Sequence, residues 1–172
     1  MWAQISDGFR PNFMDAVVWD LGCGYGDLGH YALENNAAVV YFCDKDWKLV
    51  QMAMQKSIDY QDQIFGYSFN INPDTVRWAA SHADVGIMTS VLPYLGEPRG
   101  VMKAAADFPL LFIECQYSGD GPGLDWIEND QMMGNLIEYA GFFEWAKIGS
   151  TTVQDRGAER SIWACGAEGM IF

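Results

Sequence analysis

The residues best suited to chemistry stand in a short glycine-rich stretch near the start of the chain. Residues 20–26 read Asp-Leu-Gly-Cys-Gly-Tyr-Gly and follow an apolar run, residues 16–19, that is typical of a buried strand. Glycine tolerates a left-handed backbone and, because it has no Cβ, lets a ligand lie against the main chain. A helix after such a turn points free N–H groups at the ligand. A carboxylate just before the glycines suits a ligand that also carries a positive charge. The stretch therefore predicts a cofactor-binding loop formed by Asp20, Gly22, Cys23, Gly24 and Gly26.

The same stretch contains a second pattern, so the loop alone leaves the cofactor open. Gly24, Gly26 and Gly29 satisfy Gly-x-Gly-x-x-Gly, which is typical of nicotinamide or flavin dinucleotide binding. Asp44 ends the next apolar run, where a carboxylate can accept hydrogen bonds from both ribose hydroxyls of an adenosine. Lys45 beside it could flank the adenine. These two residues support an adenosine-containing cofactor of either class.

The elements that must position these residues alternate between strands and helices. The expected strands are residues 16–20, 38–43, a stretch within 65–71, 85–89 and 110–115. The expected helices are residues 27–35, 47–58, 73–81 and 99–106. Asp46 and Asn72 stand where N-caps would begin two of these helices. This alternation indicates βαβ units and a parallel sheet covered on both faces.

The last quarter of the chain predicts a reversal of strand direction. A helix over residues 125–140 ends at Gly141, a residue suited to a left-handed C-cap. A strand then runs to about residue 153, residues 155–158 form a turn, and residues 161–165 return as a strand. A hairpin at the end of a parallel sheet requires one antiparallel strand. We therefore expect an α/β fold with a doubly wound, Rossmann-like, seven-stranded sheet, mostly parallel with a reversed final strand.

On these features the chain resembles class I S-adenosylmethionine-dependent methyltransferases. Their first motif, acidic-x-Gly-x-Gly-x-Gly at the end of the first strand, matches residues 20–26, and their Ala-Gly-Phe-type corner matches residues 140–142. The resemblance covers about residues 16–166 and implies S-adenosyl-L-methionine as the cofactor, with Asp20 facing its α-amino group. A dinucleotide-binding domain would end on a parallel strand and need a separate substrate domain, for which 172 residues leave no room.

The resemblance also implies roles for residues that follow the later strands. Asn70 is expected to meet the adenine amino group, and Ser90 to contact the cofactor near its methyl group. Glu114 ends the fifth strand, on the side where ligands of open α/β sheets bind, so its carboxylate could orient an amine or act as a base. Tyr94 could line the acceptor pocket. Glu114 and Tyr94 are therefore the predicted catalytic residues, and no metal is required.

Two departures from the family leave the acceptor unspecified. The Pro-Gly-Gly turn that many small-molecule methyltransferases carry before the fifth strand is replaced by Ala-Asp-Phe-Pro at residues 106–109. About fifteen residues precede the first strand, so Trp2, Phe9 and Phe13 are expected to form only a reduced lid. We expect one methyltransferase domain over residues 1–172, with residues 1–15 as a short N-terminal segment.

The amino-acid composition indicates which classes of acceptor and which cellular compartment to expect. The net charge is −13 and no window clusters Lys or Arg, whereas nucleic-acid binders usually show a basic footprint. A small-molecule or protein acceptor is therefore expected, and a nucleic acid only with a partner that supplies positive charge. The four cysteines lie in or beside apolar runs without Cys-x-x-Cys spacing, which indicates reduced thiols in the cytoplasm. No apolar run has transmembrane length, and exposed strand edges permit a homo-oligomer.

Two other functions stay open at this point. The first is a nicotinamide-dependent oxidoreductase that uses Gly24, Gly26 and Gly29. The second is a non-catalytic module with the methyltransferase fold that scaffolds a partner protein.

Overall fold

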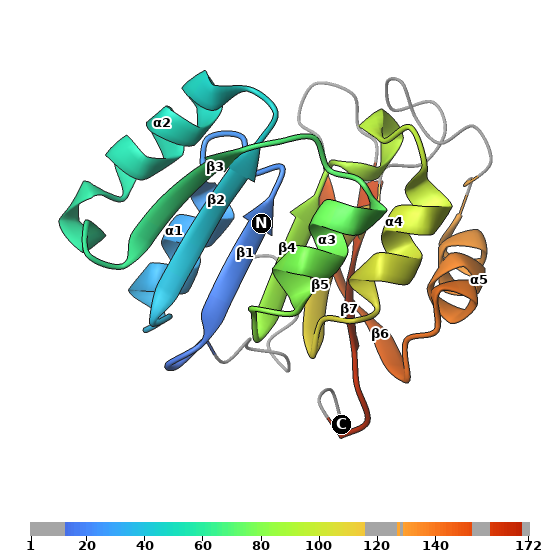
Figure 1. Cartoon of the computed structure of the whole chain (residues 1–172). Helices are drawn as coiled ribbons and strands as arrows, with labels where there is room; N and C mark the ends of the chain where they lie inside the picture. Colours follow the sequence, from blue (N-terminus) through green and yellow to red (C-terminus); the bar gives the residue numbers. More distant parts are fainter. Residues whose placement is uncertain (1–12, 116–126, 128, 153–158, 170–172) are drawn as a thin grey trace.

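A seven-stranded sheet with the order β3-β2-β1-β4-β5-β7-β6 forms the centre of the molecule. The computed structural model describes residues 13–115, 127, 129–152 and 159–169. Neighbouring strands from β3 to β5 pair in parallel, whereas β7 runs antiparallel to both β5 and β6 (Figure 1). The predicted fold class is confirmed. The strands are β1 (Val17–Leu21), β2 (Val39–Asp44), β3 (Ile64–Ser68), β4 (Val85–Thr89), β5 (Leu110–Cys115), β6 (Glu144–Thr152) and β7 (Glu159–Gly166).

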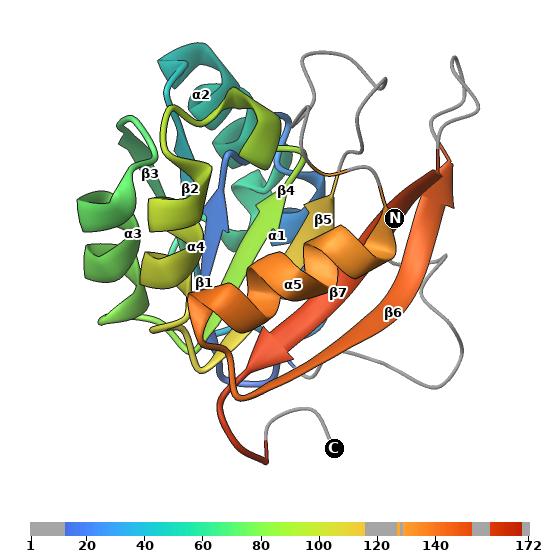
Figure 2. The same ribbon diagram turned by 90° about the vertical axis from the view of Figure 1, so that its right-hand side faces the viewer.

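Helices cover both faces of this sheet (Figures 1 and 2). One face carries α1 and α2, and the other carries α3, α4 and α5. Each face has its own apolar cluster: Trp19 and Leu21 of β1 belong to one, and Val18, which points the opposite way, belongs to the other. The helices are α1 (Asp27–Glu34), α2 (Trp47–Lys56), α3 (Pro73–Ala80), α4 (Pro98–Ala105) and α5 (Asp130–Ala140), with short 3-10 turns η2 (Ile58–Tyr60) and η3 (Leu92–Tyr94).

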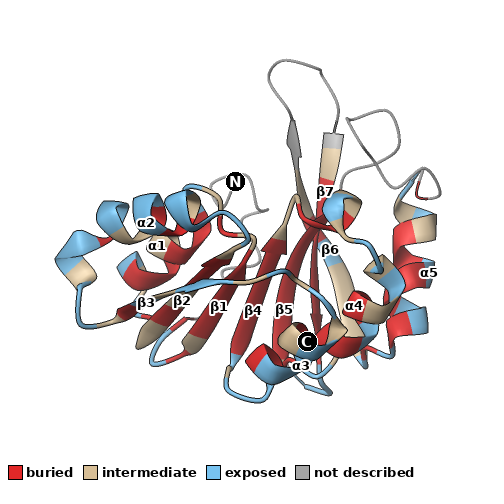
Figure 3. Ribbon diagram, turned by 45° about the horizontal axis from the view of Figure 1, so that its top comes forward, coloured by how far each residue is buried: buried red, intermediate tan, exposed pale blue. Residues whose placement is uncertain are grey.

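Burial decreases from the middle of the sheet to the β3 edge (Figure 3). All six residues of β5 are buried, as expected for a strand that has neighbours on both sides and helices on both faces. In β3 only Ile64 is buried. The central strands β1, β4 and β5 therefore give the loops at their ends a rigid base.

The predicted elements agree with the observed ones most closely where strands are buried. β4 and β5 begin and end at the predicted residues. Helix α2 begins as predicted, because the Asp46 side chain accepts a hydrogen bond from the Lys48 N–H at 2.9 Å. The helix ends at Lys56, however, and Ile58 lies beyond it in η2 and is exposed. The prediction that this helix extends to residue 58 is wrong.

Two further predictions need correction. Helix α5 begins at Asp130 instead of near residue 125, because the Asn129 side chain caps it by accepting from the Met132 N–H at 3.1 Å. Phe13 is buried against Tyr31 and Phe112 on the face of the sheet that carries α1, so it belongs to the core and forms no lid. Trp2, Phe9 and the turn predicted at residues 155–158 lie outside the described residues.

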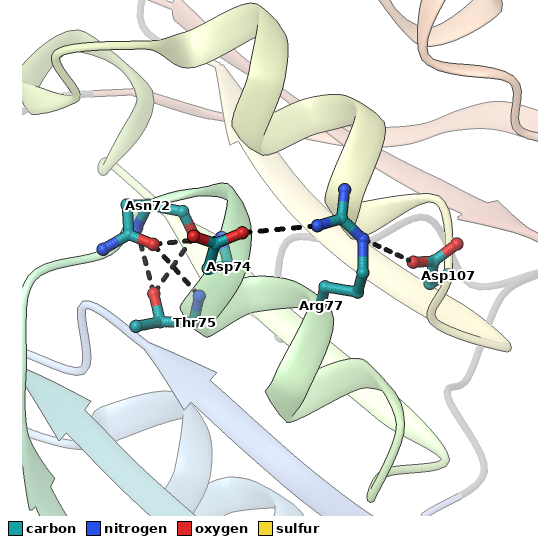
Figure 4. Close-up of polar contacts among 5 residues, drawn as sticks. All are labelled: Asn72, Asp74, Thr75, Arg77 and Asp107. Atoms are coloured by element: carbon teal, nitrogen blue, oxygen red, sulfur yellow. Dashed lines mark hydrogen bonds and ion pairs between the residues drawn. The ribbon is translucent and has the colours of Figure 1, made fainter.

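Polar contacts fix the start of α3, in the connection between β3 and β4, and link this helix to a residue after α4 (Figure 4). The Asn72 side chain accepts from the N–H groups of Asp74 and Thr75, each at 3.0 Å, and Thr75 Oγ1 accepts from the Asn72 N–H at 3.0 Å. The predicted N-cap is confirmed. Arg77 reaches Asp74 at 3.5 Å and Asp107, after α4, at 3.6 Å. These exposed pairs tie α3 to the turn that leads into β5.

The four cysteines are free and buried. Burial raises the pKa of Cys43 and of Cys115 to about 12 and raises those of Cys23 and Cys165 further. These thiols are therefore protonated and unreactive at neutral pH. In the part of the chain that the structure describes, no helix is long and apolar enough to cross a membrane.

Candidate functional site

A cavity of about 430 Å³ opens where the order of the strands reverses. The chain leaves β1 toward β2 on one side, while β4 lies on the other side of β1, and ligands of open α/β sheets bind at such a switch point. The cavity size is typical of a small-molecule or cofactor site. Six of the predicted site residues line it, and they come from the loops after four different strands: Gly22, Asp44, Lys45, Asn70, Ser90 and Tyr94.

Much of the cavity wall is apolar, and the sequence analysis missed it. Leu49, Phe69 and Ile71 line the side toward β2 and β3, and Val91 and Leu95 line the side toward β4. These residues carry no motif, because apolar side chains that line a ligand site and those that fill a core read alike in a sequence. For Phe69, Ile71 and Val91, the position directly after β3 or β4 is the one signal that pointed to them, whereas Leu49 lies in α2.

The three glycines of the loop are required for different reasons. All three have left-handed backbones, with φ of 77° at Gly22, 52° at Gly24 and 74° at Gly26. A Cβ on Gly22 would lie 2.3 Å from Val91 Cγ2, and a Cβ on Gly26 would lie 2.8 Å from the Ala53 backbone. At Gly24 no described atom lies within 4 Å of such a Cβ. The first and third glycines thus allow close packing, whereas the second borders open space.

Asp20 lies beneath this loop and does not line the cavity. It is 2% exposed, and its Oδ2 accepts a hydrogen bond from the Gly29 N–H at 3.0 Å. Burial raises its pKa to about 7, and the charges of Asp27 and Asp44 add to this shift, while the hydrogen bond from Gly29 opposes it. Gly29 itself is packed against Phe42, since a Cβ there would lie 2.3 Å from the ring. The third glycine of the dinucleotide-type pattern therefore serves packing and the Asp20 hydrogen bond.

Asp44 joins the glycine loop to the end of β2. Its Oδ2 accepts from the Gly24 N–H at 3.3 Å, and its Oδ1 accepts from the Asp46 N–H at 2.9 Å. The carboxylate is half-buried and borders the cavity. The backbone oxygen of Cys43, one residue earlier, accepts from the N–H groups of Gly22 and Cys23. The glycine loop and Asp44, the residue predicted to bind the ribose, are therefore held together by hydrogen bonds.

Three polar side chains near the site, Ser90, Glu114 and Arg160, join the ends of β4, β5 and β7. Ser90, after β4, donates a hydrogen bond from its hydroxyl to Glu114 Oε2 at the end of β5. Arg160 of β7 donates to Ser90 Oγ at 2.9 Å and lies 3.6 Å from Glu114 Oε2. Glu114 is 2% exposed, and Ser90 has a left-handed φ of 56°, which is uncommon for a residue other than glycine. Such backbone strain is concentrated at functional sites.

The structure separates the two residues that were predicted to be catalytic. Tyr94 lies in η3, lines the cavity and is 58% exposed. Glu114 is buried, is engaged by Ser90 and Arg160, and does not line the cavity. Arg160 carried no signal in the sequence, because it belongs to the returning strand and reaches the site only through the antiparallel pairing of β7 with β5.

Comparison with known proteins supports the architecture. No family model and no curated protein matches the sequence. Among solved structures, the bifunctional kinase-methyltransferase WbdD matches with a TM-score of 0.72 and 16% identity over 88% of this chain. Magnesium protoporphyrin IX methyltransferase (ChlM) from Synechocystis PCC 6803 with bound SAM matches with a TM-score of 0.70 and 21% identity over 91% of this chain. The methyltransferase domain of bacterial CtHen1 matches with a TM-score of 0.64 and 16% identity over 88% of this chain.

This chain has the class I methyltransferase fold. It spans 35% of the WbdD chain, 72% of ChlM and 91% of the CtHen1 domain. A methyltransferase fold has a reversed strand beside β5, and β7 occupies that place here. A dinucleotide-binding sheet would have a parallel strand at this position, so the topology disfavours the oxidoreductase alternative. Among the described residues, no group of three or more His, Cys, Asp or Glu side chains is arranged to hold a metal ion.

Proposed function

We propose that the protein transfers a methyl group from S-adenosyl-L-methionine to a small-molecule or protein acceptor. The observation that carries this proposal is the cavity at the switch point, which the glycine loop and Asp44 border in a methyltransferase fold. Its volume of about 430 Å³ and the open space at Gly24 fit a cofactor that lies against the main chain.

The residues present fit the two polar ends of this cofactor. Asp44 would accept the ribose hydroxyls, with Asn70 and Lys45 beside the adenine and Leu49 and Ile71 providing apolar contact. The methionine part would extend along Gly22 and Gly24 toward Ser90. Asp20, buried beneath the loop, would ionise on binding and interact with the ammonium group through the loop or through water.

The chemistry requires the protein mainly to position and enclose the reactants. When bound, the cofactor supplies a methyl group that its sulfonium charge already activates. The contribution of this chain is orientation in a partly dry cavity. Tyr94, exposed at the rim, is placed to contact the acceptor, whereas Glu114 acts through Ser90 as a positioning residue. A buried carboxylate engaged by Arg160 is poorly placed to remove a proton from an acceptor.

The acceptor class follows from charge. With 23 acidic and 10 basic side chains, the chain repels nucleic-acid phosphates unless a partner supplies positive charge. A neutral or cationic small molecule or a protein side chain meets no such barrier. The buried, protonated thiols support a reducing compartment such as the cytoplasm.

Isothermal titration calorimetry with S-adenosylhomocysteine and with NAD tests the cofactor assignment. We expect the first to bind and the second not to bind. Binding of NAD without S-adenosylhomocysteine would identify an oxidoreductase, and binding of neither would favour the scaffold module. Methyl transfer is then measured with radiolabelled cofactor on panels of amines, phenols, peptides and RNA. Transfer confined to RNA would contradict the proposed acceptor class.

A further inference from the structure

The two edges of the sheet are built differently. β6 forms one edge and carries Glu144 and Lys147, together with a register shift between Lys147 and Gly149. Charged side chains and irregular pairing are the usual means by which an edge strand avoids pairing with another chain. β3 forms the other edge and has neither: its residues read Ile-Phe-Gly-Tyr-Ser, and its pairing with β2 is regular. Among the described residues, no strand pairs with the outer side of β3.

An aromatic surface extends from this edge across the neighbouring strands. Phe65 and Tyr67 of β3 are 46% and 39% exposed and lie on the same face of the sheet as Tyr41, with ring centroids 5.4 and 5.9 Å from it. Trp78 of α3 lies beside them, 45% exposed, with its ring centroid 5.9 Å from that of Tyr67. Figure 3 shows the exposed and intermediate colouring of β3 beside the buried central strands. Contiguous exposed apolar surface of this kind marks an interaction site.

The distribution of charge indicates what the surface binds. Residues 63–73 contain no charged side chain, although the chain has 23 acidic residues and a net charge of −13. Two copies of so acidic a chain repel each other over most of their surface. The β3 edge is therefore a part of the surface where a second copy meets little of this repulsion.

The strand is also complementary to itself. An antiparallel pair of β3 strands related by a two-fold axis at Gly66 would place Phe65 opposite Tyr67 of the second copy, and Tyr67 opposite its Phe65. Directly opposite aromatic residues stabilise antiparallel pairs. Each copy contributes the same patch, as a two-fold symmetric dimer requires.

We propose that the protein forms a two-fold symmetric dimer through its β3 edge, with Phe65 and Tyr67 of the two copies paired across the axis. The sheets of the two copies join into one, and the aromatic surfaces around Tyr41 and Trp78 meet on one face of it. The cavity at the switch point begins beyond the end of β3, at Phe69, and neither Phe65 nor Tyr67 lines it, so the dimer does not depend on the proposed methyl transfer.

Analytical ultracentrifugation tests the dimer directly. The wild-type chain has a mass of 19.3 kDa and is expected to sediment as a dimer of twice this mass at micromolar concentration. The fraction of dimer should be larger in 0.5 M NaCl than in 0.05 M NaCl, because salt screens the repulsion between acidic copies. Phe65→Lys and Tyr67→Lys are expected to give monomers with unchanged circular dichroism and unchanged S-adenosylhomocysteine binding. Phe143→Lys is the matched control and should remain dimeric. Phe143 is 72% exposed and directly precedes β6, at the opposite edge of the sheet.

The register is tested by disulfide crosslinking between copies. A mixture of Phe65→Cys and Tyr67→Cys chains is expected to crosslink under mild oxidation, because directly opposite residues have Cα atoms within about 5.5 Å. Either variant alone should crosslink at least tenfold more slowly. The native thiols are buried and should therefore not crosslink. A wild-type monomer at 50 μM, or dimers that survive both lysine substitutions, would overturn the proposal. Equal crosslinking in the single-variant samples would overturn the two-fold axis at Gly66.

Discussion

The three loop glycines make separable contributions, because only Gly24 borders open space. Gly24→Ala puts a Cβ into the region where we expect the cofactor. We expect S-adenosylhomocysteine binding to weaken by at least tenfold, measured by calorimetry, while the free energy of unfolding falls by only about 1–2 kcal/mol from the left-handed backbone. Gly169→Ala is the matched control, since Gly169 also has a left-handed φ, of 78°, and open space around it, but lies after β7, at the end of the sheet opposite the cavity. Equal binding by both variants would contradict the proposed position of the cofactor.

Asp20 makes stability and binding depend on pH. Its pKa of about 7 in the folded chain exceeds the ordinary value of 3.8 for an aspartate, so the folded state holds a proton that the unfolded state releases between these two pH values. The contribution of Asp20 protonation to the free energy of unfolding is therefore complete below about pH 4 and is lost as the pH rises toward about 7. Above that pH the contribution no longer changes. Asp20→Asn cannot ionise. We expect its melting temperature, relative to wild type, to be higher at pH 8 than at pH 5.

The same substitution should weaken cofactor binding. The Asp20 carboxylate would make a charge-assisted interaction with the ammonium group of the cofactor. Asn at this position cannot make it, so the affinity for the cofactor should fall by roughly tenfold to a hundredfold. Calorimetry of wild type near pH 6.5 in buffers of different ionisation enthalpy should also detect proton release on binding. A melting difference that does not change with pH would show that Asp20 is already ionised in the free protein.

At the scale of elements, Arg160 joins β7 to the ends of β4 and β5. Arg160→Gln removes the guanidinium from beside the buried Glu114 carboxylate and should lower the free energy of unfolding by about 3–5 kcal/mol. Glu114→Gln in the same chain should restore most of this loss. Lys147→Gln, which removes the more exposed pair with Asp130, should cost about 1 kcal/mol or less. Urea denaturation measures all three, and equal losses for Arg160→Gln and Lys147→Gln would contradict the role of the buried pair.

The cap of α3 provides a second prediction about an element. Asn72→Ala removes the acceptor for the N–H groups of Asp74 and Thr75 and should cost about 1 kcal/mol. Arg77→Ala breaks only exposed pairs with Asp74 and Asp107 and should cost less than about 0.5 kcal/mol. Chemical denaturation of the two variants gives the comparison. A larger effect for Arg77→Ala would show that the exposed network matters more than the cap.

Much of the architecture could be predicted from local sequence. Asn72 and Asp46 indicate helix starts, and Gly141 indicates a helix end. The buried strand β4 is bounded by Asp84 and Ser90, and β5 begins directly after Pro109. Predictions were wrong where tertiary packing decided the outcome, as for Ile58 and Phe13. The site divided in the same way. Gly22 was chosen from the glycine motif and Asp44 from its place at the end of a strand, and both line the cavity. Arg160 could not be identified, since its contact with Glu114 depends on the pairing of β5 with β7, whose paired ends, Cys115 and Ser161, are 46 residues apart in sequence.

At the scale of the whole molecule, the distribution of the cysteines makes them reporters of global unfolding. All four are buried and protonated at neutral pH. We expect Ellman's reagent at pH 8 to modify none of them in the native protein within minutes and all four in 6 M guanidinium chloride. Cys23, in the glycine loop, should react first in the native protein, and S-adenosylhomocysteine should slow it. Rapid native labelling of Cys165, between two strands of the sheet, would contradict the described packing.

The different surroundings of the loop glycines also bear on how this sequence can diverge. A side chain at position 22 would meet the Val91 side chain and one at position 26 would meet the Ala53 backbone, whatever the protein does, because these close contacts belong to the fold itself. Gly24 meets no such neighbour, and a left-handed Asn or Asp is tolerated there once no ligand has to fit. A descendant that had abandoned its cofactor would therefore drift at position 24 first and keep 22 and 26. The glycine at position 24 in this chain is what continuing selection for a bound ligand would leave behind.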